Sequence, residues 1–141
     1  MTMSDQAQPA GDEIEVRVAA DPAQLPVLRA IASVVAMRQD FDLDAIADLK
    51  MAVDEACSML VLNAAKGSIL SCRFQPAKAE IRVLATALSD NDEWPDTGSF
   101  GWHVLSTLTD TVDASVAPAS ADPGGFTLRI ELSKRNGLGH E

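Results

Sequence analysis

The residues of this sequence whose types suit chemistry fall in two short segments, 48–57 and 98–101. In the first segment, Glu55 stands beside Ala56 and Cys57 within an apolar periodic run. A carboxylate can act as a general base when it lines a pocket and reaches the hydroxyl group whose proton it removes. The alternative is a glutamate on a solvated helix face, which periodicity by itself favours.

The second segment, Gly98-Ser-Phe-Gly101, precedes a predicted helix. Glycines at a helix N-terminus let a phosphate group approach the backbone, where free N–H groups attract it. The alternative is a Gly-Ser turn that only caps the helix, because neither the Walker spacing nor the dinucleotide-binding spacing is present. These glycines indicate a nucleotide site only if a second motif supports them.

An acidic loop lies just before the glycines and contains Asp90, Asp92, Glu93 and Asp96. Such carboxylates could hold a divalent cation, and the alternative is a solvated loop. Without a cation these carboxylates would repel a triphosphate, because both groups are negatively charged. The loop therefore counts mildly against a nucleotide site.

Two tryptophans, Trp94 and Trp102, flank the glycines, and His103 follows them. A tryptophan at such a place is either part of the core or an anchor of an interface, since this residue is enriched at binding hot spots. No serine or cysteine stands at a recognisable triad spacing from His103, which favours a structural or surface histidine.

Composition narrows the function further. The chain has 141 residues, with 11 Lys and Arg against 21 Asp and Glu, a formal net charge of -10. A chain of this length forms one domain whose core needs no metal or disulfide. The negative charge argues against binding to nucleic acid or to an acidic membrane and favours a basic protein partner.

The sequence shows no targeting segment and no run of about 20 apolar residues, so we expect a cytoplasmic protein. Cys57 and Cys72 lie in apolar-patterned segments and are interpreted as reduced, buried thiols. With only His103 and His140 besides, a zinc site is not expected.

Hydrophobic periodicity predicts the elements that position these residues. Apolar residues alternate over 14–18 and recur at helical spacing from Leu25 to Met37, and Asp42 caps a longer helix that stops at Gly67. On that helix Glu55 and Met59 lie one turn apart, opposite the apolar stripe.

A hairpin, a third helix and two last strands complete the predicted order, at 68–74 and 80–87, at 102–110, and at 111–117 and 126–132. The order predicts an α+β fold, a two-layer sandwich whose mixed sheet is covered on one face by three helices. We expect one domain over 13–133, a disordered N-terminal tail over 1–12 and a flexible C-terminal tail over 134–141.

The two segments together resemble a known family. Asp48-Leu-Lys-Met-Ala-Val-Asp-Glu55-Ala-Cys resembles the N-box helix of RsbW-type anti-sigma factors, the serine-kinase branch of the GHKL (histidine-kinase-like) ATPase fold. The run from Gly98 to Val112 resembles the second glycine box of that family and its following helix. The resemblance covers about 13–133 and is strongest to the actinobacterial branch that restrains the sigma factor SigF.

The resemblance implies two activities, sequestration of an alternative sigma factor and ATP-dependent phosphorylation of a serine on a STAS-fold anti-anti-sigma factor. It assigns the general base to Glu55 and the ATP phosphates to the glycine box at Gly98, Ser99 and Gly101. Asp90 and Asp92 are candidates, by position only, for the aspartate that recognises adenine.

Three features depart from the family pattern. Met59 replaces the asparagine that ligates Mg²⁺ in the family, and a thioether is a poor ligand for that cation, so no metal ligand is assigned. The stretch 85–92 also lacks the first glycine box, Asp-x-Gly-x-Gly. The stretch between the two boxes is also short, which leaves little chain for a lid over the phosphates. All three departures weaken ATP and magnesium binding and leave sigma-factor binding intact.

We therefore interpret the chain as an anti-sigma factor of the SigF/SigB type with degenerate ATP motifs and weak or lost kinase activity. The alternative is an active serine kinase with atypical metal coordination, and a third is a nucleotide-free scaffold unrelated to sigma control. The resemblance implies that the first two helices contact the partner, and it leaves a homodimer possible. Four acidic residues should attract basic sigma residues, namely Asp40, Asp42, Asp44 and Asp48.

Overall fold

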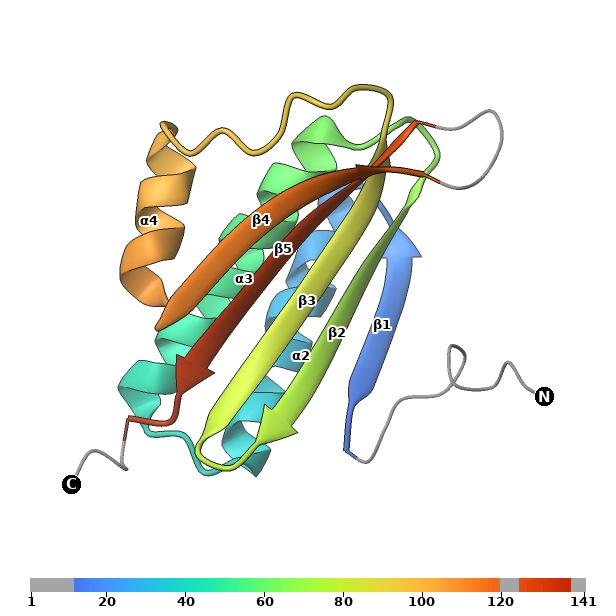
Figure 1. The fold of residues 1–141 in the computed structure, drawn as a ribbon. Helices are drawn as coiled ribbons and strands as arrows, with labels where there is room; N and C mark the ends of the chain where they lie inside the picture. The colour runs from blue at the N-terminus through green and yellow to red at the C-terminus, as the bar shows by residue number, and fades with distance from the viewer. Residues whose placement is uncertain (1–11, 120–124, 138–141) are drawn as a thin grey trace.

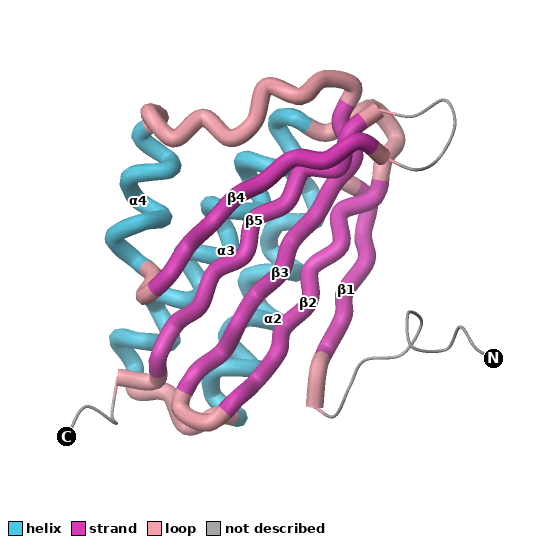
Figure 2. Tube along the Cα trace, viewed as in Figure 1, coloured by secondary structure: helices cyan, strands magenta, loops and turns pink. Residues whose placement is uncertain are grey.

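The computed structural model describes residues 12–119 and 125–137. Their elements follow in the order β1 (Ile14–Ala19), η1 (Pro22–Gln24), α2 (Leu25–Arg38), α3 (Leu43–Asn63), β2 (Ile69–Ala77), β3 (Glu80–Ser89), α4 (Phe100–Leu108), β4 (Thr111–Pro118) and β5 (Phe126–Arg135). Five strands form one sheet, and α2, α3 and α4 cover one of its faces (Figures 1 and 2). The α+β sandwich predicted from the sequence is confirmed.

The sheet has the strand order β1-β2-β3-β5-β4, and every pair of neighbours is antiparallel. The expectation of a mixed sheet was wrong in this respect. Strands β3 and β4, which α4 connects, do run in the same direction. However, β5 returns between them, so no two hydrogen-bonded neighbours are parallel.

The core lies between the sheet and the helices. Side chains alternate in direction along a strand, so one face of β3 is buried through Ile81, Val83, Ala85 and Ala87. Helix α3 supplies the largest helical share, because its apolar stripe faces the sheet while α2 and α4 pack on its sides. The other sheet face is open and carries ion pairs such as Arg82 with Glu131 at 3.0 Å.

The beginning of β1 is fixed by a buried carboxylate. Glu13 accepts hydrogen bonds from Arg73 Nε at 2.6 Å and from Gln75 Nε2 at 3.1 Å. The bond to Glu13 raises the pKa of the Arg73 guanidinium above its ordinary value. This contact joins the edge strand to β2 across the sheet.

Several element boundaries differ from the sequence-based expectation, and α4, for example, spans Phe100–Leu108 where 102–110 was predicted. Helix α3 ends at Asn63, and Gly67 takes a positive φ of 77° in the turn that follows. Strand β2 runs through Pro76, which is tolerated because β1 pairs with β2 only as far as Phe74.

The end of the last strand differs most. Strand β5 continues to Arg135, so the chain is ordered beyond Lys134, where we expected the C-terminal tail to begin. Lys134 pairs with Asp48 of α3, and the Arg135 backbone N–H donates to Asp110 Oδ2 at 2.7 Å. Expectations for residues 1–11 and 138–141 lie outside the described residues.

Asp42 begins α3 as the sequence predicts. Its Oδ1 accepts a hydrogen bond from the Ala45 N–H at 2.8 Å, which satisfies one of the free N–H groups of the first helical turn. The same carboxylate lies against Gly137, where a Cβ atom would come within 2.7 Å of Asp42 Oδ2. Asp42 is therefore a structural residue.

We expect Asp42→Ala to lower the free energy of unfolding by about 1 kcal/mol, because the substitution removes the cap. The matched control Asp44→Ala changes an exposed residue of the same turn and should cost only a few tenths of a kcal/mol, from its interaction with the helix dipole. Urea denaturation measures both values. Equal losses would show that the cap contributes nothing.

Candidate functional site

The two segments singled out in the sequence meet in the structure, because α4 packs against α3. The Glu55 carboxylate lies directly against Gly101, so closely that a Cβ atom there would overlap Glu55 Oε2. The same Cβ would lie 3.7 Å from Met59 Sδ. The absence of a side chain at position 101 is what allows this approach.

The glycine segment is shaped by its own hydrogen bonds. Ser99 caps α4, its Oγ accepting from the Trp102 N–H at 3.1 Å and donating to the Asp96 carbonyl at 2.9 Å. The Gly98 N–H donates to Asp96 Oδ1 at 3.2 Å. Ser99 of this segment thus caps α4, and this capping is compatible with both interpretations of the glycines.

Glu55 stands at the positive end of α4. The first turn of a helix presents free N–H groups and a partial positive charge, which favour a nearby anion. In a nucleotide-binding protein a phosphate takes this kind of position. Here the chain supplies its own carboxylate, and its negative charge opposes a second anion at the same place.

Met59 does not lie on a solvated helix face, because α4 and the loop after β3 cover it. Its side chain is only 9% exposed. Asn63, one turn further along α3, donates from Nδ2 to the Met59 carbonyl at 2.8 Å, which holds its amide beside the helix backbone. A buried thioether does not suit magnesium, which requires oxygen ligands.

A cavity of about 180 Å³ opens beside Met59, and we call it the Met59 pocket. Its lining consists of Met59, Leu62, Asn63, Glu93, Trp94, Asp96 and Ser99. Small-molecule sites usually measure about 300–1,000 Å³. The cavity is smaller than that range, and its lining combines a thioether with two carboxylates and no lysine or arginine, so it would repel the phosphates of a nucleotide unless a divalent cation intervened.

Trp94 forms a fixed wall of this pocket. It is 7% exposed, and its indole Nε1 donates to the Arg129 carbonyl at 3.3 Å. Asp90 and Asp92, the candidates for adenine recognition, are exposed and do not line the pocket. Leu62 was missed by the sequence reasoning, because no local pattern distinguishes it from a residue on the polar side of α3.

The four acidic residues expected at the partner interface serve different purposes. Asp42 is the cap described above, and Asp48 Oδ2 accepts from Lys134 Nζ at 3.2 Å. Asp40 and Asp44 are exposed, Asp40 at a positive φ of 60°. Only these last two carboxylates are available to a partner without breaking a contact within the chain.

The remaining candidate residues do not line the Met59 pocket. His103 is exposed and Trp102 half-buried on α4. Cys57 and Cys72 are fully buried free thiols. A hydrogen bond with the Cys57 side chain, together with burial, raises the pKa of the Cys72 thiol, so that thiol is neutral near pH 7.

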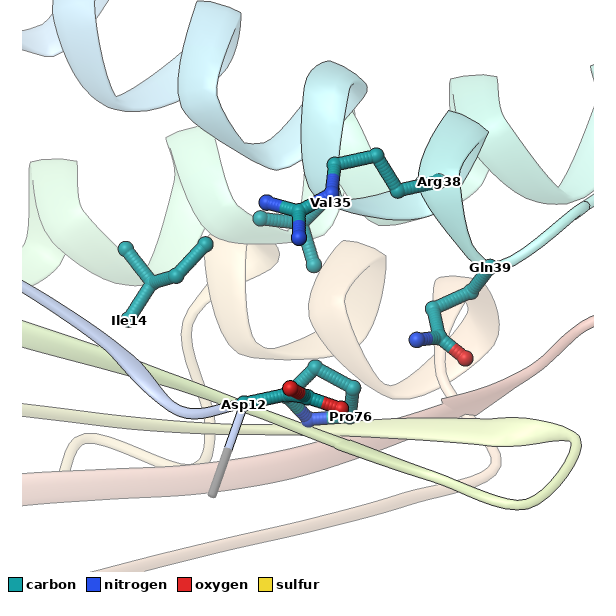
Figure 3. A pocket seen from close by; sticks show the side chains of 6 residues that line it. All are labelled: Asp12, Ile14, Val35, Arg38, Gln39 and Pro76. Carbon is teal, nitrogen blue, oxygen red and sulfur yellow. The ribbon is translucent and has the colours of Figure 1, made fainter. Parts of the chain in front are cut away.

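A second cavity, of about 230 Å³, lies between the end of α2 and the first two strands (Figure 3). Arg38 and Gln39 border it on the helix side, and Asp12 and Pro76 border it on the strand side. None of the candidate site residues lines it.

Among the described helices, none combines the length and apolar character needed to cross a membrane.

The fold, with a glycine segment packed on a glutamate-bearing helix, is that of a GHKL-type sandwich. The chain is 36% identical over 122 residues to the anti-sigma-F factor RsbW of Mycobacterium tuberculosis, covering 86% of this chain and 73% of that protein. It is 31% identical over 122 residues to the serine-protein kinase RsbW of Bacillus subtilis, covering 72% of this chain and 76% of the kinase. No family-level sequence profile matches it. The chain belongs to the RsbW family, as the resemblance indicated.

The contact between Glu55 and Gly101 can be tested by a double-mutant cycle. We expect Glu55→Gln to lower the free energy of unfolding by about 0.5–1 kcal/mol, because it removes a negative charge from the N-terminus of α4. In a Gly101→Ala background the same change should have little effect, since the added methyl group displaces the carboxylate. Urea denaturation of the four proteins measures the coupling.

Gly98→Ala is the matched control, because a Cβ there meets only Asp96 Oδ1, at an ordinary 3.7 Å. Glu55→Gln should keep its full effect in that background. An identical effect in all three backgrounds would show that the Glu55 carboxylate does not stabilise α4.

Proposed function

We propose that this chain is a cytoplasmic anti-sigma factor that sequesters an alternative sigma factor of the SigF or SigB type. A STAS-fold anti-anti-sigma factor then releases the sigma factor by competing for the chain. The name of the Mycobacterium tuberculosis relative, which matches most of this chain, supports the first part. Both partners, the sigma factor and its antagonist, are inferred from the family, and each acts by binding the chain.

The single observation that favours binding over catalysis is the filling of the space between α3 and Gly101. Glu55 and the buried Met59 occupy that space, and the Met59 thioether offers no oxygen ligand for magnesium. Release of the sigma factor would then follow the concentrations and affinities of the two protein partners, with no phosphoryl transfer.

The acidic end of α3 suits the proposed partner. Asp40 and Asp44 are exposed at the beginning of the helix and carry negative charge toward solvent. A sigma factor that binds promoter DNA presents basic side chains, and opposite charges speed the encounter of two proteins. The proposal therefore places part of the sigma-factor contact at this end.

Self-association belongs to the same proposal. Helix α2 presents exposed apolar side chains at helical spacing, of which Val27, Val34 and Met37 are 44%, 48% and 54% exposed. Such a stripe suits packing against the same stripe of a second copy. A dimer would offer a sigma factor two acidic ends.

The second candidate function is an active serine kinase. It is favoured by the position of Glu55, which stands at the glycine segment where the family places its general base, and by the name of the Bacillus subtilis relative. This function would require a magnesium site built without the side chain of Met59.

Phosphate transfer distinguishes the two candidates. With Mg-ATP and the STAS protein of its own cell, we expect the chain to transfer phosphate at least about 100-fold more slowly than the Bacillus subtilis kinase does with its own partner, because ligands that stabilise developing charge are missing. Transfer at a comparable rate, abolished by Glu55→Gln, would establish the kinase and overturn our preference.

Salt dependence tests the acidic contact. We expect the association rate with the sigma factor to fall about tenfold between low and high ionic strength, because long-range attraction is screened. The double variant Asp40→Asn/Asp44→Asn should flatten this dependence, whereas Asp113→Asn, an exposed change on β4, should leave it unchanged. Stopped-flow measurements give the association rates, and rates that do not change with salt concentration would contradict the proposal.

A further inference from the structure

One exposed hydrophobic side chain lines the Met59 pocket, and a second directly follows a lining residue in the sequence. Leu62, which lines it, is 83% exposed, and Phe100, which follows the lining residue Ser99, is 80% exposed. Large apolar side chains exposed to this degree around a hollow often mark a protein contact. They come from α3 and α4, the two elements that would hold a nucleotide between them in an ATPase of this fold.

The rim of the pocket is acidic. Glu93 and Asp96 line it, Asp90 and Asp92 precede them in the same loop, and all four are exposed. The sequence contains no lysine or arginine between Arg82 and Arg129, so no cation from this stretch neutralises the loop. The charge at the rim repels phosphate groups and attracts a cation.

The floor of the pocket is apolar, since Met59 and Trp94 form it and both are largely buried. A volume of about 180 Å³ is small for a nucleotide but suits one long side chain. Lysine and arginine combine an apolar stem with a charged head, so they can lay the stem on an apolar floor and direct the head toward rim carboxylates.

We infer that the Met59 pocket is a docking site for a basic, aliphatic segment of a protein partner. One lysine or arginine of that segment enters the pocket and reaches Glu93 and Asp96, while neighbouring aliphatic side chains cover Leu62 and Phe100. This inference concerns a surface separate from the acidic beginning of α3, and it holds whichever protein partner the chain has.

The acidic beginning of α3 is a poorer candidate for such docking. Its cavity, of about 230 Å³, already contains Lys134 and Arg135 of the same chain, and Lys134 is paired with Asp48. The Met59 pocket contains no basic residue, so its carboxylates are not paired in this way. It therefore combines negative charge, an apolar floor and exposed hydrophobic borders at one place.

A peptide titration tests the inference. The full ¹⁵N-labelled chain is titrated with the blocked peptide acetyl-Leu-Lys-Leu-Leu-Lys-Leu-amide, with the same peptide carrying Glu in place of Lys, and with Mg-ATP. The reporters are the Trp94 indole N–H and the backbone amides of Glu93 and Ser99. We expect saturable shifts with the lysine peptide and none with the glutamate peptide or Mg-ATP.

Matched variants distinguish binding at this pocket from non-specific binding of the peptide. Leu62→Ser and Glu93→Gln should each weaken the lysine peptide by roughly five- to tenfold, the effect of losing one contact. Leu43→Ser, a leucine that is also 83% exposed but stands at the other end of α3, and Asp113→Asn on β4 should leave its affinity unchanged. All four residues are at the surface or rim, so folding should be retained, and the spectra confirm it.

Several results would overturn the inference. These are no saturable shift with the lysine peptide, equal binding of the glutamate peptide, shifts confined to the amides of 40–48, or equal weakening by the control variants. Saturable shifts of the Trp94 indole by Mg-ATP alone would also overturn it, because the pocket would then be a nucleotide site. Failure of the chain to bind a sigma factor would not bear on these outcomes.

Discussion

The burial of one face of α3 is the constraint on which the rest of the structure depends. This helix of 21 residues places its apolar stripe on the sheet, with α2 on one side and α4 on the other. Because a helix repeats every 3.6 residues, fixing one face fixes the direction of all other side chains. The directions of the Asp42, Glu55 and Leu62 side chains all follow from this packing of α3 on the sheet.

Because one face of α3 is buried, the surroundings of the Glu55 carboxylate depend on α4. The carboxylate points away from the sheet, as the periodicity predicts, but it meets Gly101 at the N-terminus of another helix. A charge that would be solvated on an isolated helix becomes an anion at a helix N-terminus. The chemistry of the residue is set by a contact between segments far apart in the chain.

Local patterns predicted most of the fold. Alternation marked the strands, helical spacing marked α2 and α3, and the short polar residues Asp42 and Ser99 marked the beginnings of two helices. These signals succeed because each depends on side chains only a few residues apart. The sheet order was less accessible, since the insertion of β5 between β3 and β4 depends on pairing between distant strands.

The candidate site was predicted only in part, for the same reason. The sequence identified Glu55, Met59 and the glycine segment, yet the burial of Met59 depends on α4 and the loop after β3, which no pattern within α3 reveals. Asp42 and Asp48 appeared available because charge was counted along the sequence, whereas a backbone N–H and Lys134 already engage them. The fold and the family could thus be predicted from the sequence more fully than the contacts that each side chain makes.

The contact at Asp42 has a practical consequence for work with this protein. The Asp42 backbone N–H donates to the Asn136 carbonyl at 3.3 Å, and the Asp42 carboxylate lies against Gly137. The last described residues, Asn136 and Gly137, therefore lie at the beginning of α3, next to the exposed Asp40 and Asp44. A charged or bulky group attached directly after Gly137 would therefore lie next to that charged end and alter its local electrostatics.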